Sequence, residues 1–206
     1  FANMIFDKRK IQWYNAAQAG RSTRTYLNEG RWERVYNSLQ PGDFVLIQFG
    51  HNDIGSINKE KARGVIASSA DTCHVYRNEN DGKYELVYSF GWYLKKFIDD
   101  VREKGAIPIL ISLTPRNEWF DHKIERRNDT YGKWYRDIVK ETGVDFVDLH
   151  NITADWLDKH CGSKEKSSMY FKHDHTHSSM KGAYLNAKNI AKGLRAESCS
   201  LAKYLK

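Results

Sequence analysis

The segment from Phe44 to Asp53 reads F-V-L-I-Q-F-G-H-N-D and decides the fold class of this 206-residue chain. Pro41-Gly42 and Gly50 bound its apolar part, which is too short for a buried helix and predicts a strand at residues 44–49, buried on both faces. Such a strand belongs in a parallel sheet that is covered by helices. Ligands of these sheets bind just beyond the carboxyl ends of the strands, so residues 50–53 are expected to be functional.

Apolar patterns elsewhere in the chain predict that strands and helices alternate. Further strands are expected at residues 11–17, 107–113 and 144–149, and a small hairpin at 75–76 and 84–87. Helices are expected at residues 1–7 (with Phe1, Met4 and Ile5 on one face), 26–39, 88–104, 131–142, 151–160 and 179–195, and a loop at 161–173. This order predicts one α/β domain over residues 1–206, a three-layer α/β/α sandwich with a central parallel sheet.

Composition limits the classes of partner. The net charge is +7 and the pI is about 9.2, but basic and acidic residues are interspersed and no nucleic-acid recognition motif is present. We therefore expect no nucleic-acid partner, whereas an acidic polysaccharide fits the charge. The mean hydropathy is −0.71, and no apolar run approaches the roughly 18 residues that a membrane helix needs. A soluble protein without a membrane partner is predicted, and no oligomeric state is indicated.

The three cysteines, Cys73, Cys161 and Cys199, show no C-x-x-C spacing, which argues against a zinc ribbon or a thioredoxin-like site. Two alternatives stay open for them. Either a disulfide joins Cys161 to Cys199 and holds the C-terminal helix, or all three thiols are unpaired.

A second group of polar residues, K-H-D-H-T-H at 172–177, lies just before the last predicted helix. Asp174 precedes His177 by three residues in one loop. This spacing lets the carboxylate hold one imidazole nitrogen while the other nitrogen faces a nucleophile. The aspartate then fixes the tautomer of the histidine and stabilises the imidazolium, as in a hydrolytic triad.

Three blocks in order resemble the second, third and fifth blocks of the SGNH (GDSL-like) hydrolases: A-G-R-S at 19–22, G-H-N-D at 50–53 and D-H-T-H at 174–177. The flanking text, such as N-x-A-x-x-G-R-S at 15–22 and T-P-R-N at 114–117, resembles the rhamnogalacturonan acetylesterase branch. The resemblance covers nearly the whole chain. It implies the flavodoxin-like fold of that superfamily and a serine-type ester hydrolase that needs no cofactor.

The resemblance also implies residue roles. In the family an oxyanion is held by the amide of the nucleophile, by the amide of a block II glycine and by the side chain of a block III asparagine, which match Gly20 and Asn52 here. Removing such a donor raises a barrier by about 3 to 4 kcal/mol. Asp174 and His177 match the family's catalytic pair, in which the histidine is the base and the aspartate orients it. His51 is expected to shape the loop, and Asp53 to cap or orient it.

The chain departs from the family pattern at its start, because the G-D-S block that supplies the nucleophile and follows the first strand is absent. We therefore expect the native polypeptide to begin some tens of residues earlier, so that the domain in this chain is incomplete at its N-terminus. Ser22 is a poor substitute for the missing nucleophile, since G-R-S-T-R lacks the second glycine of a nucleophile elbow.

Arg24, Arg116 and Asn117 lie in predicted loops at the functional end of the sheet, where an arginine fork suits the carboxylate of a galacturonate. They are candidate substrate-binding residues. Trp119 and Phe120, in a polar loop, are candidates for stacking on sugar rings.

The resulting hypothesis is a carbohydrate esterase that removes acetyl groups from a pectic polysaccharide, rhamnogalacturonan, through an acyl-enzyme. A substrate of this kind implies a periplasmic or secreted enzyme that takes part in pectin degradation. One alternative is a non-catalytic domain that binds acidic polysaccharide. Another is a metal-dependent hydrolase in which His173, His175 and His177 alternate along an extended segment and bind zinc; since the family block is metal-free, no metal is expected.

Overall fold

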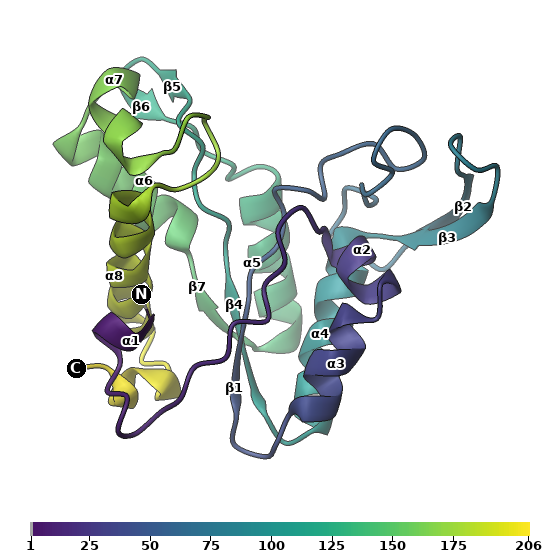
Figure 1. The fold of residues 1–206 in the computed structure, drawn as a ribbon, viewed down its shortest axis with the longest axis horizontal. Helices are drawn as coiled ribbons and strands as arrows, with labels where there is room; N and C mark the ends of the chain where they lie inside the picture. Colours follow the sequence, from purple (N-terminus) through teal and green to yellow (C-terminus); the bar gives the residue numbers. More distant parts are fainter. Residues whose placement is uncertain (1) are drawn as a thin grey trace. The chain divides into compact units, whose positions relative to one another are not determined.

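The computed structural model describes residues 2–206 (Figure 1). The chain forms two compact units, each made of discontinuous segments. Unit 1 contains the N-terminal residues through Asn15, Ile111–Gly132 and Phe146–Lys206. Unit 2 contains Ala16–Leu110 and Lys133–Asp145. Phe1, which was predicted to share a helical face with Met4 and Ile5, lies outside the described residues.

The central sheet contains β1 (Phe44–Ile47), β4 (Ile107–Ile111) and β7 (Asp145–Val147), in the order β1-β4-β7. β1 pairs with β4 in parallel, from Phe44 opposite Ile107 to Ile47 opposite Leu110. Helices flank this sheet, so the predicted α/β class with a central parallel sheet is confirmed. β4, the middle strand, is the buried one: its last four residues are all buried.

β1 is less buried than predicted, because only Ile47 is buried and the three residues before it are half-buried. Among residues 2–206, β4 is the only strand that pairs with β1. The strand predicted at residues 11–17 is wrong, since this segment has no regular secondary structure. A strand needs a neighbour to satisfy its backbone N–H and C=O groups, and no described strand pairs with this segment.

Unit 2 contains the helices α2 (Thr23–Asn28), α3 (Arg31–Ser38) and α4 (Phe90–Glu103) and most of α5 (Tyr131–Thr142). The single helix predicted at 26–39 is wrong: the chain breaks between α2 and α3 at Gly30, whose φ of +67° is left-handed. Aromatic rings fill the core of this unit. The rings of Trp32 and Phe97 lie 4.2 Å apart, and Tyr135 donates its hydroxyl to the carbonyl of Phe49 at 2.8 Å.

The predicted hairpin is confirmed as β2 (Cys73–Arg77) and β3 (Tyr84–Tyr88), which pair antiparallel. The preceding loop, residues 54–66, is tied to it by several hydrogen bonds, of which two are the shortest. The amide of Glu79 donates to the carbonyl of Asn58 at 2.7 Å, and Asn80 Nδ2 donates to the carbonyl of Glu60 at 2.9 Å.

Unit 1 contains mainly helices and one small hairpin. Its elements are α1 (Ala2–Ile5), β5 (Trp119–Phe120), β6 (Lys123–Ile124), α6 (Leu149–His160), α7 (Lys164–Ser167), the 3-10 turn η1 (Ser168–Tyr170), α8 (Met180–Ala196) and a second 3-10 turn, η2 (Ser200–Tyr204). The loop predicted at 161–173 therefore contains two short helical elements. Ser163 begins the first of them, because its hydroxyl accepts a hydrogen bond from the amide of Lys166.

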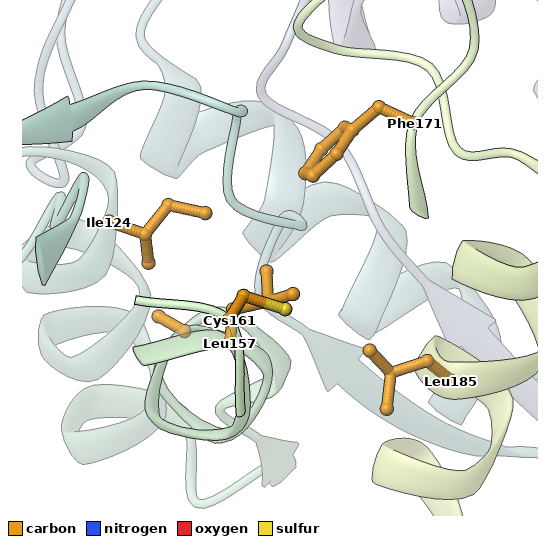
Figure 2. Close-up of a cluster of buried hydrophobic side chains, with 6 residues drawn as sticks. Ile124, Leu157, Cys161, Phe171 and Leu185 are labelled. Atoms are coloured by element: carbon orange, nitrogen blue, oxygen red, sulfur yellow. The ribbon is translucent and has the colours of Figure 1, made fainter. Parts of the chain in front are cut away.

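One buried apolar cluster holds the elements of unit 1 together. Figure 2 shows its side chains, which come from β6, from α6 and the residue that follows it, from the segment after η1, and from α8. The members of the cluster are Ile124, Ala154, Leu157, Cys161, Phe171 and Leu185. Phe171 is the member nearest in sequence to the aspartate–histidine segment, so that segment begins at a residue fixed in the core.

The structure decides between the two alternatives for the cysteines: no disulfide forms among the described residues. Cys161 and Cys199 are buried and Cys73 is exposed. Within residues 2–206, no helix is long and apolar enough to cross a membrane.

Candidate active site

The loop between η1 and α8 brings Asp174 and His177 into direct contact. Oδ2 of Asp174 lies 2.7 Å from Nδ1 of His177, and Oδ1 of Asp174 accepts hydrogen bonds from the amides of Thr176 and His177, each at 2.7 Å. The amide of His177, then its imidazole and the amide of Thr176, hold the pKa of Asp174 well below its usual range. The aspartate is therefore ionised near neutral pH and orients the imidazole.

This loop is closed by backbone contacts at its two ends. Phe171 and Ser178 form an antiparallel bridge, and the amide of Lys172 donates to the carbonyl of His177 at 2.8 Å. α8 starts directly afterwards, with the Ser179 hydroxyl as its cap. Gly182 lets the helix approach the loop, since a Cβ there would lie 1.9 Å from the carbonyl oxygen of Tyr170. The aspartate–histidine pair is thus built on a short, closed segment.

The far side of the His177 ring is open to solvent. The side chain is 70% exposed, and Nε2 makes no hydrogen bond with the described part of the chain. With Nδ1 occupied by Asp174, Nε2 is the nitrogen that can exchange a proton with a nucleophile or with water.

The other two histidines of the segment do not form a metal site with His177. The backbone bends at each residue from 173 to 177, so the extended segment assumed by the zinc alternative is wrong. Nδ1 of His175 lies 3.0 Å from the Thr176 hydroxyl and 3.5 Å from Oε1 of Glu118. Among residues 2–206, no three His, Cys, Asp or Glu side chains are grouped to hold a metal ion.

Asn117 supports the loop from inside unit 1. Its amide donates to the carbonyl of His175 at 2.7 Å, while Oδ1 accepts hydrogen bonds from Trp119 Nε1 at 2.8 Å and from the Ser167 hydroxyl at 2.6 Å. The residue is 4% exposed. The structure therefore assigns Asn117 a supporting role rather than the predicted contact with substrate.

Arg116 and the two aromatic residues after it stay candidates for substrate contact. Arg116 is half-buried, and its Nε has no hydrogen-bond partner among the described residues. Phe120 is 67% exposed in the β5–β6 hairpin, whereas Trp119 is partly buried against the apolar cluster of unit 1. A contact of Arg116 or Phe120 with a sugar stays a prediction.

Unit 2 carries the predicted amide donors in two loops that hydrogen-bond to each other. Gly20 has a left-handed φ of +76°, which favours glycine at this position. Asn52, in the loop after β1, donates through Nδ2 to the carbonyl of Arg21 at 3.0 Å. Asn52 is thereby held beside the Gly20 loop, and an oxyanion role for the two residues stays a prediction.

The buried side chain of Asp53 joins these two loops through hydrogen bonds. Oδ1 accepts hydrogen bonds from the amide of Thr23 at 2.9 Å and from its hydroxyl at 2.6 Å, and Oδ2 accepts one from the amide of Gly50 at 3.0 Å. The side chain is buried, and burial is the dominant influence that raises the pKa of Asp53 to about 6. The expectation that Asp53 orients its loop is confirmed.

Ser22 also belongs to this framework. It is completely buried, and its hydroxyl accepts a hydrogen bond from the amide of Thr25 at the start of α2. A serine used in this way caps a helix and has no access to a substrate.

The side chain of Arg24 is buried, whereas the sequence predicted that it would be exposed to a substrate. The residue is 2% exposed, its Nε and Nη2 pair with the carboxylate of Glu85, and Nη1 donates to the carbonyls of Ile57 at 2.8 Å and Gly64 at 2.9 Å. Because the guanidinium is buried and engaged on every nitrogen, it holds the loop of residues 54–66 to the hairpin. The predicted contact of Arg24 with a galacturonate is therefore replaced by a structural role.

Two residues of this region have no clear signal in the sequence. Thr23 follows the cap residue Ser22, which predicts that it begins a helix. The cap does not predict the hydrogen bond between Thr23 and Asp53, which lie 30 positions apart. Arg63 lies in a polar insertion, yet its Nη1 donates to the carbonyl of Gly20, 43 positions away, at 3.1 Å. Both contacts are long-range, and only the folded chain reveals them.

On a parallel α/β fold, an aspartate–histidine pair of this kind is typical of hydrolases that form an acyl-enzyme. The chain belongs to the GDSL-like Lipase/Acylhydrolase family, whose family model matches residues 2–185.

Three relatives carry the name of one activity. The chain is 31% identical to the "Rhamnogalacturonan acetylesterase" of Emericella nidulans over 195 residues, which cover 94% of this chain and 78% of that protein. It is 28% identical to the "Rhamnogalacturonan acetylesterase RhgT" of Bacillus subtilis, with 93% of this chain and 77% of that protein covered. The "Probable rhamnogalacturonan acetylesterase YesY" of the same organism is also 28% identical, with 90% and 77% covered.

Solved structures support the fold. The crystal structure of protein YxiM from Bacillus subtilis superposes with a TM-score of 0.76 at 20% identity, covering 97% of this chain and 49% of that one. The chain thus spans about half the length of YxiM. The acetylxylan esterase Axe2 from Geobacillus stearothermophilus gives a TM-score of 0.56 at 22% identity, covering 86% of this chain and 68% of that one.

Proposed function

We propose that this protein is a carbohydrate esterase that removes acetyl groups from rhamnogalacturonan or a related acetylated pectic polysaccharide. The observation that carries the proposal is the pair of Asp174 and His177, with 2.7 Å between Oδ2 and Nδ1 and with Nε2 of the histidine open to solvent. The three acetylesterase relatives support the choice of an acetyl ester on a pectic polymer as the substrate.

In the proposed reaction a serine hydroxyl attacks the acetyl carbonyl while Nε2 of His177 accepts its proton. The tetrahedral intermediate collapses, and the sugar oxygen leaves with the proton from His177. His177 then deprotonates a water molecule that attacks the acetyl-enzyme, and acetate is released as the serine regains a proton. Asp174, which stays ionised, stabilises the imidazolium in both steps.

The amide of Gly20 and the side chain of Asn52 are proposed to hold the negative oxygen of the tetrahedral intermediate. Their support is the framework of unit 2, in which Asp53 joins the two loops and Asn52 is bonded to Arg21. Preorganised donors of this kind need no reorganisation when the charge develops, which is why they lower the barrier.

The test is replacement of His177 by alanine in the full-length protein, with acetate release from acetylated rhamnogalacturonan as the measurement. We expect activity to fall to background, because the loss of the base removes proton transfer from both steps. His173→Ala is the matched control, since His173 is exposed in the same loop and should tolerate the change. Unchanged acetate release in the His177 variant would refute the assignment.

A polymeric plant substrate also leads us to propose that the enzyme is periplasmic or secreted and acts in pectin degradation. Fractionation of the producing cells, with detection of the protein by antibody, tests the location. Recovery in the cytoplasmic fraction alone would contradict it.

A further inference from the structure

Arg63 places a positive charge next to the proposed oxyanion loop. Its side chain passes over Gly55, where an added Cβ would lie 3.5 Å from Arg63 Cγ, and reaches the carbonyl of Gly20 with Nη1 at 3.1 Å. The residue is partly exposed. Within residues 2–206, the carbonyl of Gly20 is its only hydrogen-bond acceptor, and no carboxylate lies within 4 Å of its guanidinium.

The loop that presents Arg63 is held firmly. The amide of Gly64 donates to the carbonyl of Ser56 at 2.8 Å, and the amide of Val65 donates to the carbonyl of Asp53 at 3.1 Å. The buried guanidinium of Arg24 binds the same loop through the carbonyls of Ile57 and Gly64. Arg63 is therefore presented by a hydrogen-bonded loop, and a backbone fixed in this way lowers the ordering cost of binding.

The arginines around Gly20 differ in how their charge is neutralised. Arg21 and Arg31 both pair with Glu29, and Arg24 pairs with Glu85. Arg63 has no such partner among the described residues. It is thus the guanidinium of this loop cluster whose charge is available to an anionic ligand.

The geometry of the guanidinium defines what can bind. Nη1 is used by Gly20, which leaves the edge formed by Nε and Nη2 without an acceptor among the described residues. This edge presents two parallel N–H groups, and a carboxylate is the group that matches them in a bidentate fork.

We propose that Arg63 binds the carboxylate of a uronic acid residue adjacent to the acetylated sugar, and so determines the specificity of the esterase for acidic over neutral acetylated chains. The inference rests on the proposed function. Since one guanidinium would contact both the uronate and the carbonyl of Gly20, the bound carboxylate would fix the sugar chain relative to the amide donor of Gly20.

The experiment compares two substrates that differ only in charge: an acetylated oligosaccharide that contains galacturonate, and the same oligosaccharide with its carboxyl groups methyl-esterified. For Arg63→Gln in the full-length protein, we expect kcat/KM on the acid to fall by about tenfold to a hundredfold, the size of a charge-assisted contact. The fall should appear mainly in KM. On the methyl ester, kcat/KM should change by less than about threefold.

Two controls separate recognition from other effects. Lys61→Gln removes an exposed charge from the same loop and should leave both substrates nearly unchanged, since general attraction by surface charge is weak at physiological salt. Arg63→Lys keeps the charge but removes the fork, and it should lose most of the preference for the acid.

Four results would overturn the inference. If Arg63→Gln lowered kcat/KM equally on the acid and on the methyl ester, Arg63 would only support the loop of Gly20 and would not recognise the carboxylate. If kcat/KM of Arg63→Gln did not fall on either substrate, or if Lys61→Gln lowered it on the acid as much, Arg63 would have no specific role in recognising the carboxylate. If the unmodified protein released no acetate from either substrate, the proposed function itself would fall, and the inference with it.

Discussion

Asp53 and Thr23 lie 30 residues apart in the chain, yet one carboxylate oxygen of Asp53 accepts both the amide and the hydroxyl of Thr23, at 2.9 and 2.6 Å. The bond joins the loop that contains Gly20 to the loop that contains Asn52, and both loops are parts of unit 2. The proposed amide donors therefore depend on a buried, ionisable group that would not itself touch the substrate.

The raised pKa of Asp53 predicts a specific pH dependence of stability. The folded-state pKa is about 6 and the ordinary value is 3.8, so between these pH values the folded protein retains a proton that the unfolded chain has released. The unfolded state then binds fewer protons, and the free energy of unfolding decreases as pH rises from about 4 to about 6. Urea unfolding at a series of pH values, for the protein and for Asp53→Asn, measures this: the variant should lack the decrease, and identical pH profiles would contradict the prediction.

Replacing Asp174 by asparagine should lower kcat strongly while leaving the fold intact. Oδ1 of an asparagine can still accept the amides of Thr176 and His177, but its Nδ2 would face Nδ1 of His177 and impose the wrong tautomer. For a comparable substitution in a serine protease triad the loss in kcat is about 10⁴-fold, and we expect a loss of roughly 10³-fold or more. Acetate release gives the rate, and circular dichroism checks the fold. A variant with more than a tenth of the original kcat would show that Asp174 is not needed to orient the histidine.

Gly182→Ala should disturb residues 171–178, which contain Asp174 and His177, although Gly182 itself lies in α8. The new Cβ would lie 1.9 Å from the carbonyl oxygen of Tyr170, so α8 or the residues before the loop must shift. Overpacking of this kind typically costs about 1 to 3 kcal/mol, and we expect a lower melting temperature together with a lower kcat. Lys181→Ala, on the exposed side of the same turn, is the matched control. Wild-type stability in the Gly182 variant would mean that the close approach is not required.

Elements with strong local signals were predictable from the sequence. α5 has the predicted bounds, because an apolar period of 3.6 residues runs up to Gly143, and the β2–β3 hairpin forms around its Asn-Asp-Gly turn. The pair of Asp174 and His177 was also predictable, since its two members lie three residues apart in one loop.

The errors share a physical cause, which is that they depend on partners distant in sequence. The predicted strand at 11–17 has no described neighbour to pair with. The charge of Arg24 suggested exposure, but the carboxylate that allows it to be buried is Glu85, 61 positions away. Arg63 has no local motif at all, and its position beside Gly20 arises only when the loop of residues 54–66 folds back.

The closed loop of Asp174 and His177 has a consequence for the order in which the protein folds. Its hydrogen bond joins residues three apart, so loop closure costs little entropy, whereas the link from Arg63 to Gly20 must close 43 residues. On closure entropy alone, the contact between Asp174 and His177 is therefore expected to form in advance of the framework around Gly20. A partly folded chain that already contains a correctly oriented histidine would then still be inactive, which makes enzymatic activity a late marker of folding in this protein.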